Sequence, residues 1–201
     1  MRNISEFIEK LETQKNTSTV SNPYLVKGVS NNLRAYLEVM FETKGDRVLL
    51  VGEAPGHRGC KVTGIPFTSG KVFENVDHPV LKKLKSKIKL EKIESENTAT
   101  IVWNYLSTKE NTPLFWNSYP YHPHPVGNEE KNRVPNQEEI EFGVQFLKGL
   151  SSLYNPVVIA GIGYAGVECA KRAFPKNEIT YIRHPSFGGK SDFIEGMNKI
   201  I

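Results

Sequence analysis

The apolar positions of the chain recur first at helical spacing and then in a short unbroken run. Helical spacing holds over Ile4–Leu11 and again over about Asn32–Phe41, which predicts two amphipathic helices. Next comes the apolar run RVLLVG, Arg47–Gly52, which is soon followed by a proline. Its length and composition predict a strand buried on both faces. The first quarter of the chain therefore predicts two helices and then a strand.

The second half of the chain continues this alternation. Strands are predicted at Thr112–Pro120 and in the segments PVVIAGIG and EITYIRHPS. Helices are predicted at Gln137 to about Leu150, Gly163–Arg172 and Asp192–Ile200. Asn136 is a candidate N-cap, because Glu139 follows it at capping-box spacing. Such alternation predicts an α/β fold, a three-layer αβα sandwich around a mostly parallel sheet of about four strands. We expect residues 1–201 to form a single domain.

The composition is that of one compact domain, and it bears on the compartment and the partners that we expect for the protein. The 201 residues are 38% hydrophobic and 24% charged, as is ordinary for a globular domain. No segment resembles a signal peptide or is apolar enough to cross a bilayer, so we expect a cytoplasmic protein that does not bind membranes. The two cysteines, Cys60 and Cys169, form at most one disulfide and do not indicate a secreted scaffold. The net charge of +4 favours polyanionic partners only weakly.

The densest charge cluster is the segment LKKLKSKIKLEK. Its lysines are Lys82, Lys83, Lys85, Lys87, Lys89 and Lys92. A cationic patch of this kind can follow phosphates, which need cations but no sequence code. The segment is equally typical of a solvated helix face, and its apolar anchors would be Leu81, Leu84, Ile88 and Leu90. We favour the solvated helix.

Three polar, proline-rich loops leave the predicted strands and carry Glu53, Asn117 and His184. In open parallel sheets a ligand binds beyond the carboxyl ends of the strands, so these side chains are expected to share one pocket. Glu53 lies in Gly-Glu-Ala-Pro-Gly, where it can act as a general base toward water or accept hydrogen bonds that organise its own loop. An amide such as Asn117 presents a donor and an acceptor that match the edge of a pyrimidine, or it simply ends the strand.

Two further side chains fit the same pocket. Phe67, in Gly-Ile-Pro-Phe-Thr, is either a stacking platform for a base or a plug over the core. His184, in His-Pro-Ser, can donate a hydrogen bond to developing negative charge, although a lone histidine is more often structural. Their convergence with Glu53 and Asn117 favours a site.

These motifs resemble those of the family 4 uracil-DNA glycosylases and their relatives. GEAPG followed by TGIPF resembles the family's first motif, and HPSF resembles its second catalytic motif. Between them, the strand ending in Asn117 and the segment NRVPNQEEIEFGVQFL resemble the family's Asn strand and its Asn-Arg-x-Pro helix. The motifs occur in the family's order and cover roughly Arg47 to the C-terminus. The resemblance implies a DNA glycosylase that hydrolyses the N-glycosidic bond of a flipped uracil or related deaminated base in base-excision repair.

The resemblance also implies a role for each residue. Glu53 would activate the attacking water, and His184 would stabilise negative charge on the departing base. Phe67 would stack on the flipped base and Asn117 would hydrogen-bond to its polar edge. The rest of the base pocket would be formed by Gly52, Ala54, Pro55 and Gly56. DNA would be contacted by Ser69, Pro185, Ser186 and Phe187, with Phe187 as a wedge in the space left by the base.

The chain also departs from the family. Family 4 enzymes usually hold an iron–sulfur cluster on four cysteines, whereas the corresponding stretches here read Tyr119-Pro120 and Gly143. Two cysteines cannot form a four-thiolate cluster, so we expect neither a cluster nor any other cofactor. The proline-rich HPHP segment is a candidate for holding the loop that a cluster would pin. Related enzymes place an aspartate where Ala54 stands and a tyrosine that excludes the thymine methyl where Gly56 stands. Selectivity against thymine is therefore open.

Three other interpretations compete. Gly161, Gly163 and Gly166 match a dinucleotide-binding fingerprint, but no acidic residue closes the next strand, which favours a plain strand-to-helix turn. A zinc site is conceivable, although its spacing fits no standard pattern, and its ligands would be His57, Cys60, His122 and His124. The third is a superfamily member that binds nucleic acid or a free base without catalysis. The sequence leaves open which base is excised and from which form of DNA, and we expect a monomer.

Overall fold

The computed structural model describes all residues 1–201 and contains one four-stranded parallel sheet in the order β3-β2-β5-β6. Its strands are β2 (Val48–Gly52), β3 (Leu114–Asn117), β5 (Val158–Ile162) and β6 (Thr180–Ile182). The α/β fold with a parallel sheet of about four strands is thereby confirmed. The central strand β2 is buried along its whole length, as its unbroken apolar sequence predicts.

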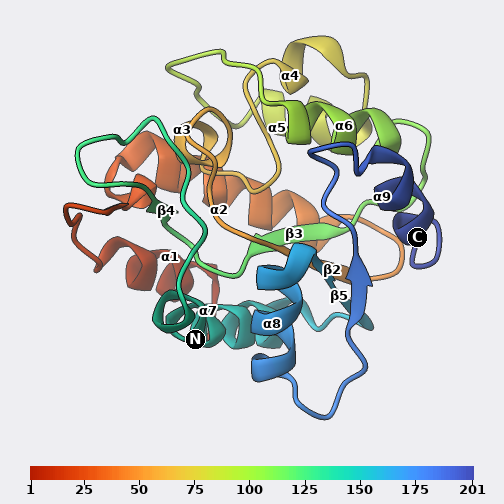
Figure 1. The fold of residues 1–201 in the computed structure, drawn as a ribbon. Coiled ribbons are helices and arrows are strands. Elements are labelled where there is room, and N and C mark those ends of the chain that lie inside the picture. Colours follow the sequence, from red (N-terminus) through yellow and green to blue (C-terminus); the bar gives the residue numbers. More distant parts are fainter.

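Helices cover both faces of the sheet and produce three layers (Figure 1). One face carries α1 (Ile4–Glu12), α7 (Gln137–Tyr154) and α8 (Gly163–Ala173). The other carries α2 (Lys27–Glu42), α3 (Cys60–Thr63), α4 (Val72–Asn75), α5 (Pro79–Lys85), α6 (Asn97–Leu106) and α9 (Lys190–Met197). None of the helices is both long and apolar enough to span a lipid bilayer.

A two-stranded antiparallel sheet lies outside the main one and fixes the segment that follows β3. It pairs β1 (Val20–Ser21), which precedes the 3₁₀ helix η1 (Pro23–Leu25), with β4 (His122–Pro123). The first half of the HPHP segment is therefore a short strand.

Several element boundaries follow local signals that the sequence contains. The α7 helix begins at the predicted capping box, in which Asn136 and Glu139 bond each other's backbone N–H groups at 2.9 and 2.8 Å. The strand predicted at Thr112–Pro120 is shorter, because only Leu114–Asn117 pairs with β2.

The lysine-rich segment is helical only as far as Lys85. Beyond it the chain leaves the helix, because the Asn32 amide binds the backbone of Lys89 on both sides, donating to its carbonyl at 2.8 Å and accepting from its N–H at 2.9 Å. The expected helix is thus too long. The expected anchors hold, since Leu81 and Leu84 are buried while the lysines are exposed.

The loop that leaves β3 is held by direct packing against α7. A methyl group on Gly143 would overlap the Ser118 carbonyl oxygen, so only glycine lets the helix approach this closely. The Cys169 thiol contacts the same carbonyl oxygen at 3.6 Å. The exit of β3, which bears Asn117, is therefore fixed by backbone contact.

We predict that Gly143→Ala lowers the free energy of unfolding by about 1–3 kcal/mol, the usual range for overpacking a close contact. Urea denaturation followed by circular dichroism measures this loss. Gly149→Ala, in the same helix, is the matched control, because a side chain there meets only the flexible Met1 side chain. Equal stability of the two variants would contradict the packing role of Gly143.

Candidate active site

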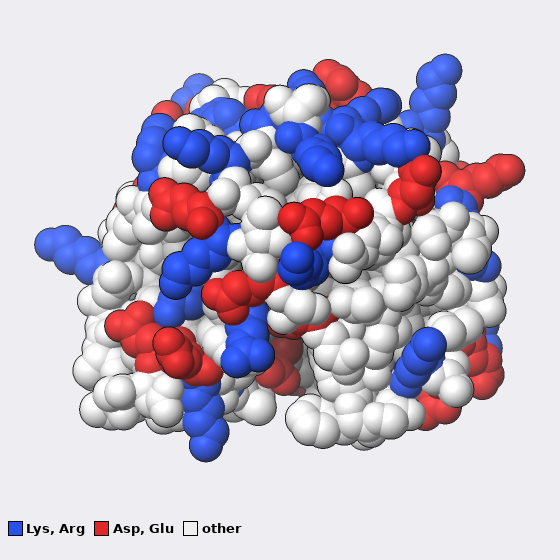
Figure 2. All heavy atoms as spheres, turned by 90° about the horizontal axis from the view of Figure 1, so that it is seen from above, with Lys and Arg blue, Asp and Glu red and all other residues white.

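A cavity of about 1040 Å³ opens where the carboxyl ends of the strands meet the loops that follow them. Eight of the twelve residues expected in the site line it, namely Glu53, Ala54, Gly56, Phe67, Asn117, His184, Ser186 and Phe187. Gly52, Pro55 and Pro185 are buried and do not line it. Seen from above, the molecule is hollowed at this place, with acidic side chains inside, while Lys and Arg gather along the opposite edge (Figure 2).

Ser69 does not lie where the DNA-binding prediction requires it. Its side chain is fully buried, makes no hydrogen bond and does not line the cavity. The sequence places it one residue beyond the Phe-Thr of the motif, but the chain turns inward there. A side chain buried in this way is not accessible to DNA.

The loop after β2 is joined to the loop after β3 by three hydrogen bonds. The N–H groups of Ser118 and Tyr119 donate to the carbonyl oxygens of Gly52 and Glu53 at 2.8 and 3.1 Å. The Ser118 hydroxyl also donates to the Glu53 carbonyl at 2.6 Å. These bonds continue the parallel pairing beyond the sheet, so the Glu53 and Asn117 side chains are held at neighbouring strand ends.

Phe67 is held in a backbone conformation that few large residues adopt. Its φ of 54° lies in the left-handed region, and its carbonyl oxygen accepts a hydrogen bond from the Trp103 indole at 3.1 Å. The ring lies on Gly52, where any side chain would overlap it, and its centroid is 5.0 Å from that of Phe115. One ring therefore both closes the core and forms a wall of the cavity.

The hydrogen bonds of His184 fix which ring nitrogen carries the proton. The Ser186 backbone N–H donates to Nδ1 at 3.2 Å, so in the neutral imidazole the proton is on Nε2. Burial, assisted by the nearby Arg183, lowers the pKa of His184 below its usual value. At neutral pH this side chain is thus a neutral hydrogen-bond donor.

Glu53 and Asn117 present polar groups to the same cavity. The Glu53 carboxyl group is partly exposed and makes no hydrogen bond within the protein, and burial raises its pKa. The Asn117 amide nitrogen lies 3.8 Å from the Cys60 sulfur, to which it can donate a weak hydrogen bond. Cys60 remains a thiol, because burial raises its pKa far above neutral pH. Glu53 is therefore free to bind water, while Cys60 orients Asn117.

The HPHP segment supports the loop that bears Glu53. Buried His122 places Nδ1 2.7 Å from the Pro55 carbonyl oxygen and Nε2 2.9 Å from that of Glu129. His124 contacts the Ser21 hydroxyl at 3.1 Å and the Pro125 carbonyl oxygen at 3.0 Å. His122 and His124, two of the four residues considered as zinc ligands, thus have protein partners, and these contacts assign them a structural role.

The glycines of the dinucleotide-like fingerprint have a packing role. A side chain on Gly166 would overlap the Val51 carbonyl oxygen of β2, and one on Gly161 would overlap the backbone of Val167. Gly163 starts α8 with a φ of 75°. The segment is thus the tight strand-to-helix turn that the sequence analysis favours.

Sequence reasoning missed the wall of the cavity formed by the start of α6. Glu96 is the N-cap of this helix, and its carboxyl group fills the space above Gly56 and Gly59, where any side chain would overlap it. It makes no hydrogen bond within the protein, and burial raises its pKa to about 7. In its neutral form this carboxyl group can both donate and accept a hydrogen bond. Thr98, in the first turn, bonds the Ser186 hydroxyl at 2.9 Å.

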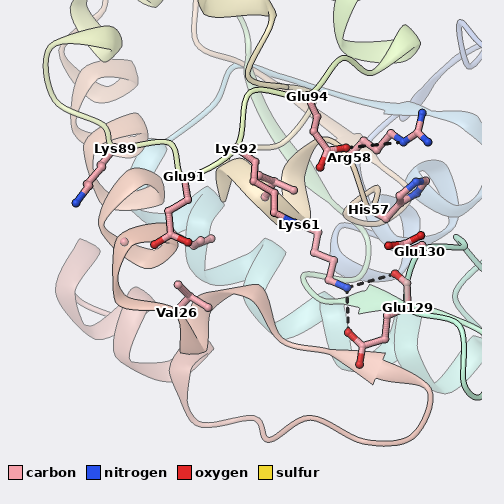
Figure 3. A pocket seen from close by; sticks show the side chains of 13 residues that line it. Val26, His57, Arg58, Lys61, Lys89, Glu91, Lys92, Glu94, Glu129 and Glu130 are labelled. Carbon is pink, nitrogen blue, oxygen red and sulfur yellow. Dashed lines mark hydrogen bonds and ion pairs between the residues drawn. The ribbon is translucent and has the colours of Figure 1, made fainter.

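A smaller cavity of about 370 Å³ adjoins the first one and shares His57 and Arg58 with it. Figure 3 shows that some of its oppositely charged side chains are paired. Lys61 binds Glu129 at 3.1 Å, and Arg58 lies 3.8 Å from Glu94. Its four cations are matched by four carboxylates, with Lys89, Lys92, Glu91 and Glu130 completing the set. This balance does not select an anion.

The residues around the β3 exit do not fit the iron–sulfur cluster of family 4 enzymes. Gly143 and the Ser118 carbonyl oxygen are in direct contact where the family's motifs carry cluster cysteines. The two cysteines of this chain are buried and already have protein partners, since Cys169 contacts that same carbonyl oxygen and Cys60 contacts Asn117. The packing of α7 and the His122 contact hold these loops instead.

The sequence profile of the uracil DNA glycosylase superfamily matches residues 40–193. The cavity, its strand-end residues and this match together define the class, and the chain belongs to the uracil-DNA glycosylase superfamily. The crystal structure of wild-type SMUG2 from Pedobacter heparinus has the same fold, with a TM-score of 0.66 and 14% sequence identity over 99% of this chain and 97% of that one. No curated protein matches the chain.

We predict that Glu96 makes stability depend on pH. Because its folded pKa is raised, from an ordinary 4.5 to about 7, its contribution is complete below pH 4.5 and is lost as pH rises toward 7. Replacement by Gln removes this titration. As pH rises from acidic to mildly alkaline, wild type should therefore lose roughly 1–3 kcal/mol more unfolding free energy than Glu96→Gln does. Urea denaturation over this range measures the difference, and parallel pH profiles would contradict it.

Proposed function

We propose that this protein is a DNA glycosylase that hydrolyses the N-glycosidic bond of a flipped uracil or related deaminated base. The observation that carries the proposal is the convergence of Glu53, Asn117 and neutral His184 from three strand ends on one cavity beside Phe67. The cavity is large enough for a nucleobase and its sugar, and membership of a superfamily that acts on DNA supports the assignment.

In the proposed reaction the base leaves the DNA stack and enters the cavity, where its face lies on Phe67 and its polar edge bonds Asn117. As the bond to C1′ lengthens, the sugar gains oxocarbenium character and negative charge accumulates on the base. The Nε2–H of His184 donates to that charge. The ionised Glu53 carboxylate accepts a proton from the water that attacks C1′, which yields the free base and an abasic site.

The same roles set the pH dependence. Glu53 acts as a base only when ionised, so the rate falls as pH drops through its raised pKa. The lowered pKa of His184 keeps the imidazole neutral down to mildly acidic pH, so its protonation does not limit the reaction near neutrality.

Oligonucleotides that each contain one uracil, hypoxanthine or mispaired thymine test the activity, with abasic sites detected by alkaline cleavage. We predict that Glu53→Gln and His184→Ala each slow base release by about two to four orders of magnitude, as expected for the loss of a general base or a charge-stabilising donor. Glu178→Gln is the matched control, because Glu178 is exposed outside the cavity. Full activity of Glu53→Gln would refute its role in activating water.

A second candidate function is binding of nucleic acid or a free base without catalysis. The absence of an aspartate at Ala54, which leaves Glu53 as the water activator, favours this alternative. Single-turnover assays separate the two, because a binding protein would retain DNA affinity and release no base from any of the substrates.

A further inference from the structure

The mouth of the cavity carries all the strongly exposed aromatic side chains of this protein. Tyr164, Tyr181 and Phe187 are 84%, 42% and 98% exposed, whereas every other Phe, Tyr and Trp is buried or half-buried. All three line the cavity. Scattered apolar residues on a surface are ordinary, but their concentration at one opening indicates a contact surface.

Two of these rings already form a pair. Tyr164 lies in the first turn of α8, and Tyr181 is the middle residue of β6, which is the edge strand of the sheet. Their ring centroids are 5.3 Å apart and their planes are inclined by 36°. A ring that is 84% exposed keeps most of its surface accessible, so the pair can accept a further flat group.

A cation without a carboxylate partner lines the same cavity as the pair. Arg183 directly follows β6, one residue beyond the end of that strand. Its only hydrogen bond is a long one of 3.4 Å to the His184 carbonyl oxygen, and no carboxylate forms an ion pair with it. Aromatic rings interleaved with a free cation are the features that bind single-stranded nucleic acid.

We infer that Tyr164 and Tyr181 form a stacking platform for an unpaired nucleobase next to the flipped nucleotide, so that the protein binds single-stranded DNA. In a duplex both faces of each base are covered by its neighbours, whereas in a single strand a base can leave its stack and lie on a ring. Arg183 then contacts a phosphate of the same strand. The inference rests on the proposed function, since it takes the cavity as the place of the flipped nucleotide.

The test measures binding without excision, by fluorescence anisotropy of an undamaged labelled oligonucleotide at fixed salt, both single-stranded and annealed to its complement. Stacking on an aromatic ring contributes about 1–3 kcal/mol per base, so we expect Tyr164→Leu/Tyr181→Leu to raise the single-strand Kd roughly 5- to 150-fold. The duplex Kd should change less than about twofold. Tyr164→Phe/Tyr181→Phe is the matched control, which keeps both rings and should keep single-strand affinity.

Equal weakening of single-strand and duplex binding by the leucine pair would overturn the platform, because it would show a contact with the backbone alone. Unchanged single-strand affinity would overturn it as well. Circular dichroism confirms that both double variants fold. A protein that binds as expected but releases no base would refute the proposed glycosylase and leave the platform standing.

Discussion

Three hydrogen bonds between the residues that follow β2 and those that follow β3 determine the geometry of the cavity. They extend the pairing of two parallel strands past the end of the sheet, with Ser118 and Tyr119 donating to the carbonyl oxygens of Gly52 and Glu53. The separation of Glu53 from Asn117 is therefore set by the sheet itself. Gly143 of α7 packs against the Ser118 carbonyl oxygen, and buried His122 contacts the Pro55 carbonyl oxygen. The backbone that carries Glu53 and Asn117 therefore cannot shift independently of its neighbours.

Burial acts on the ionisable groups of the cavity in one direction. It raises the pKa of Glu53 and Glu96 and lowers that of His184, so in each case the uncharged form gains. An interior of this kind suits a neutral nucleobase, which needs directed hydrogen bonds more than charge. Cationic charge lies at the mouth instead, where Arg183 can meet a phosphate without placing a full charge against the base.

The parts of the fold that could be predicted have local signals in the sequence. The parts that could not be predicted depend on contacts between residues that are distant in the sequence. The β2 strand is apolar throughout because it is buried on both faces, and α7 begins at a capping box formed by two residues close together in the sequence. The α6 helix escaped prediction, since its sequence is rich in β-branched residues and Glu96 provides no side-chain cap. Because α6 was missed, Glu96 was missed with it. The end of α5 depends on Asn32, more than fifty residues earlier, and no local pattern contains that information.

The left-handed backbone of Phe67 and the indole bond to its carbonyl oxygen have a consequence for the entropy of binding. A side chain that is ordered only when a ligand arrives loses rotamer freedom at that moment, and the loss subtracts from affinity. Here the bond from Trp103 fixes the Phe67 backbone, and packing against Gly52 and Phe115 holds the ring, once the core of the protein has formed. Binding of a base in the cavity therefore costs little further conformational entropy in the Phe67 side chain.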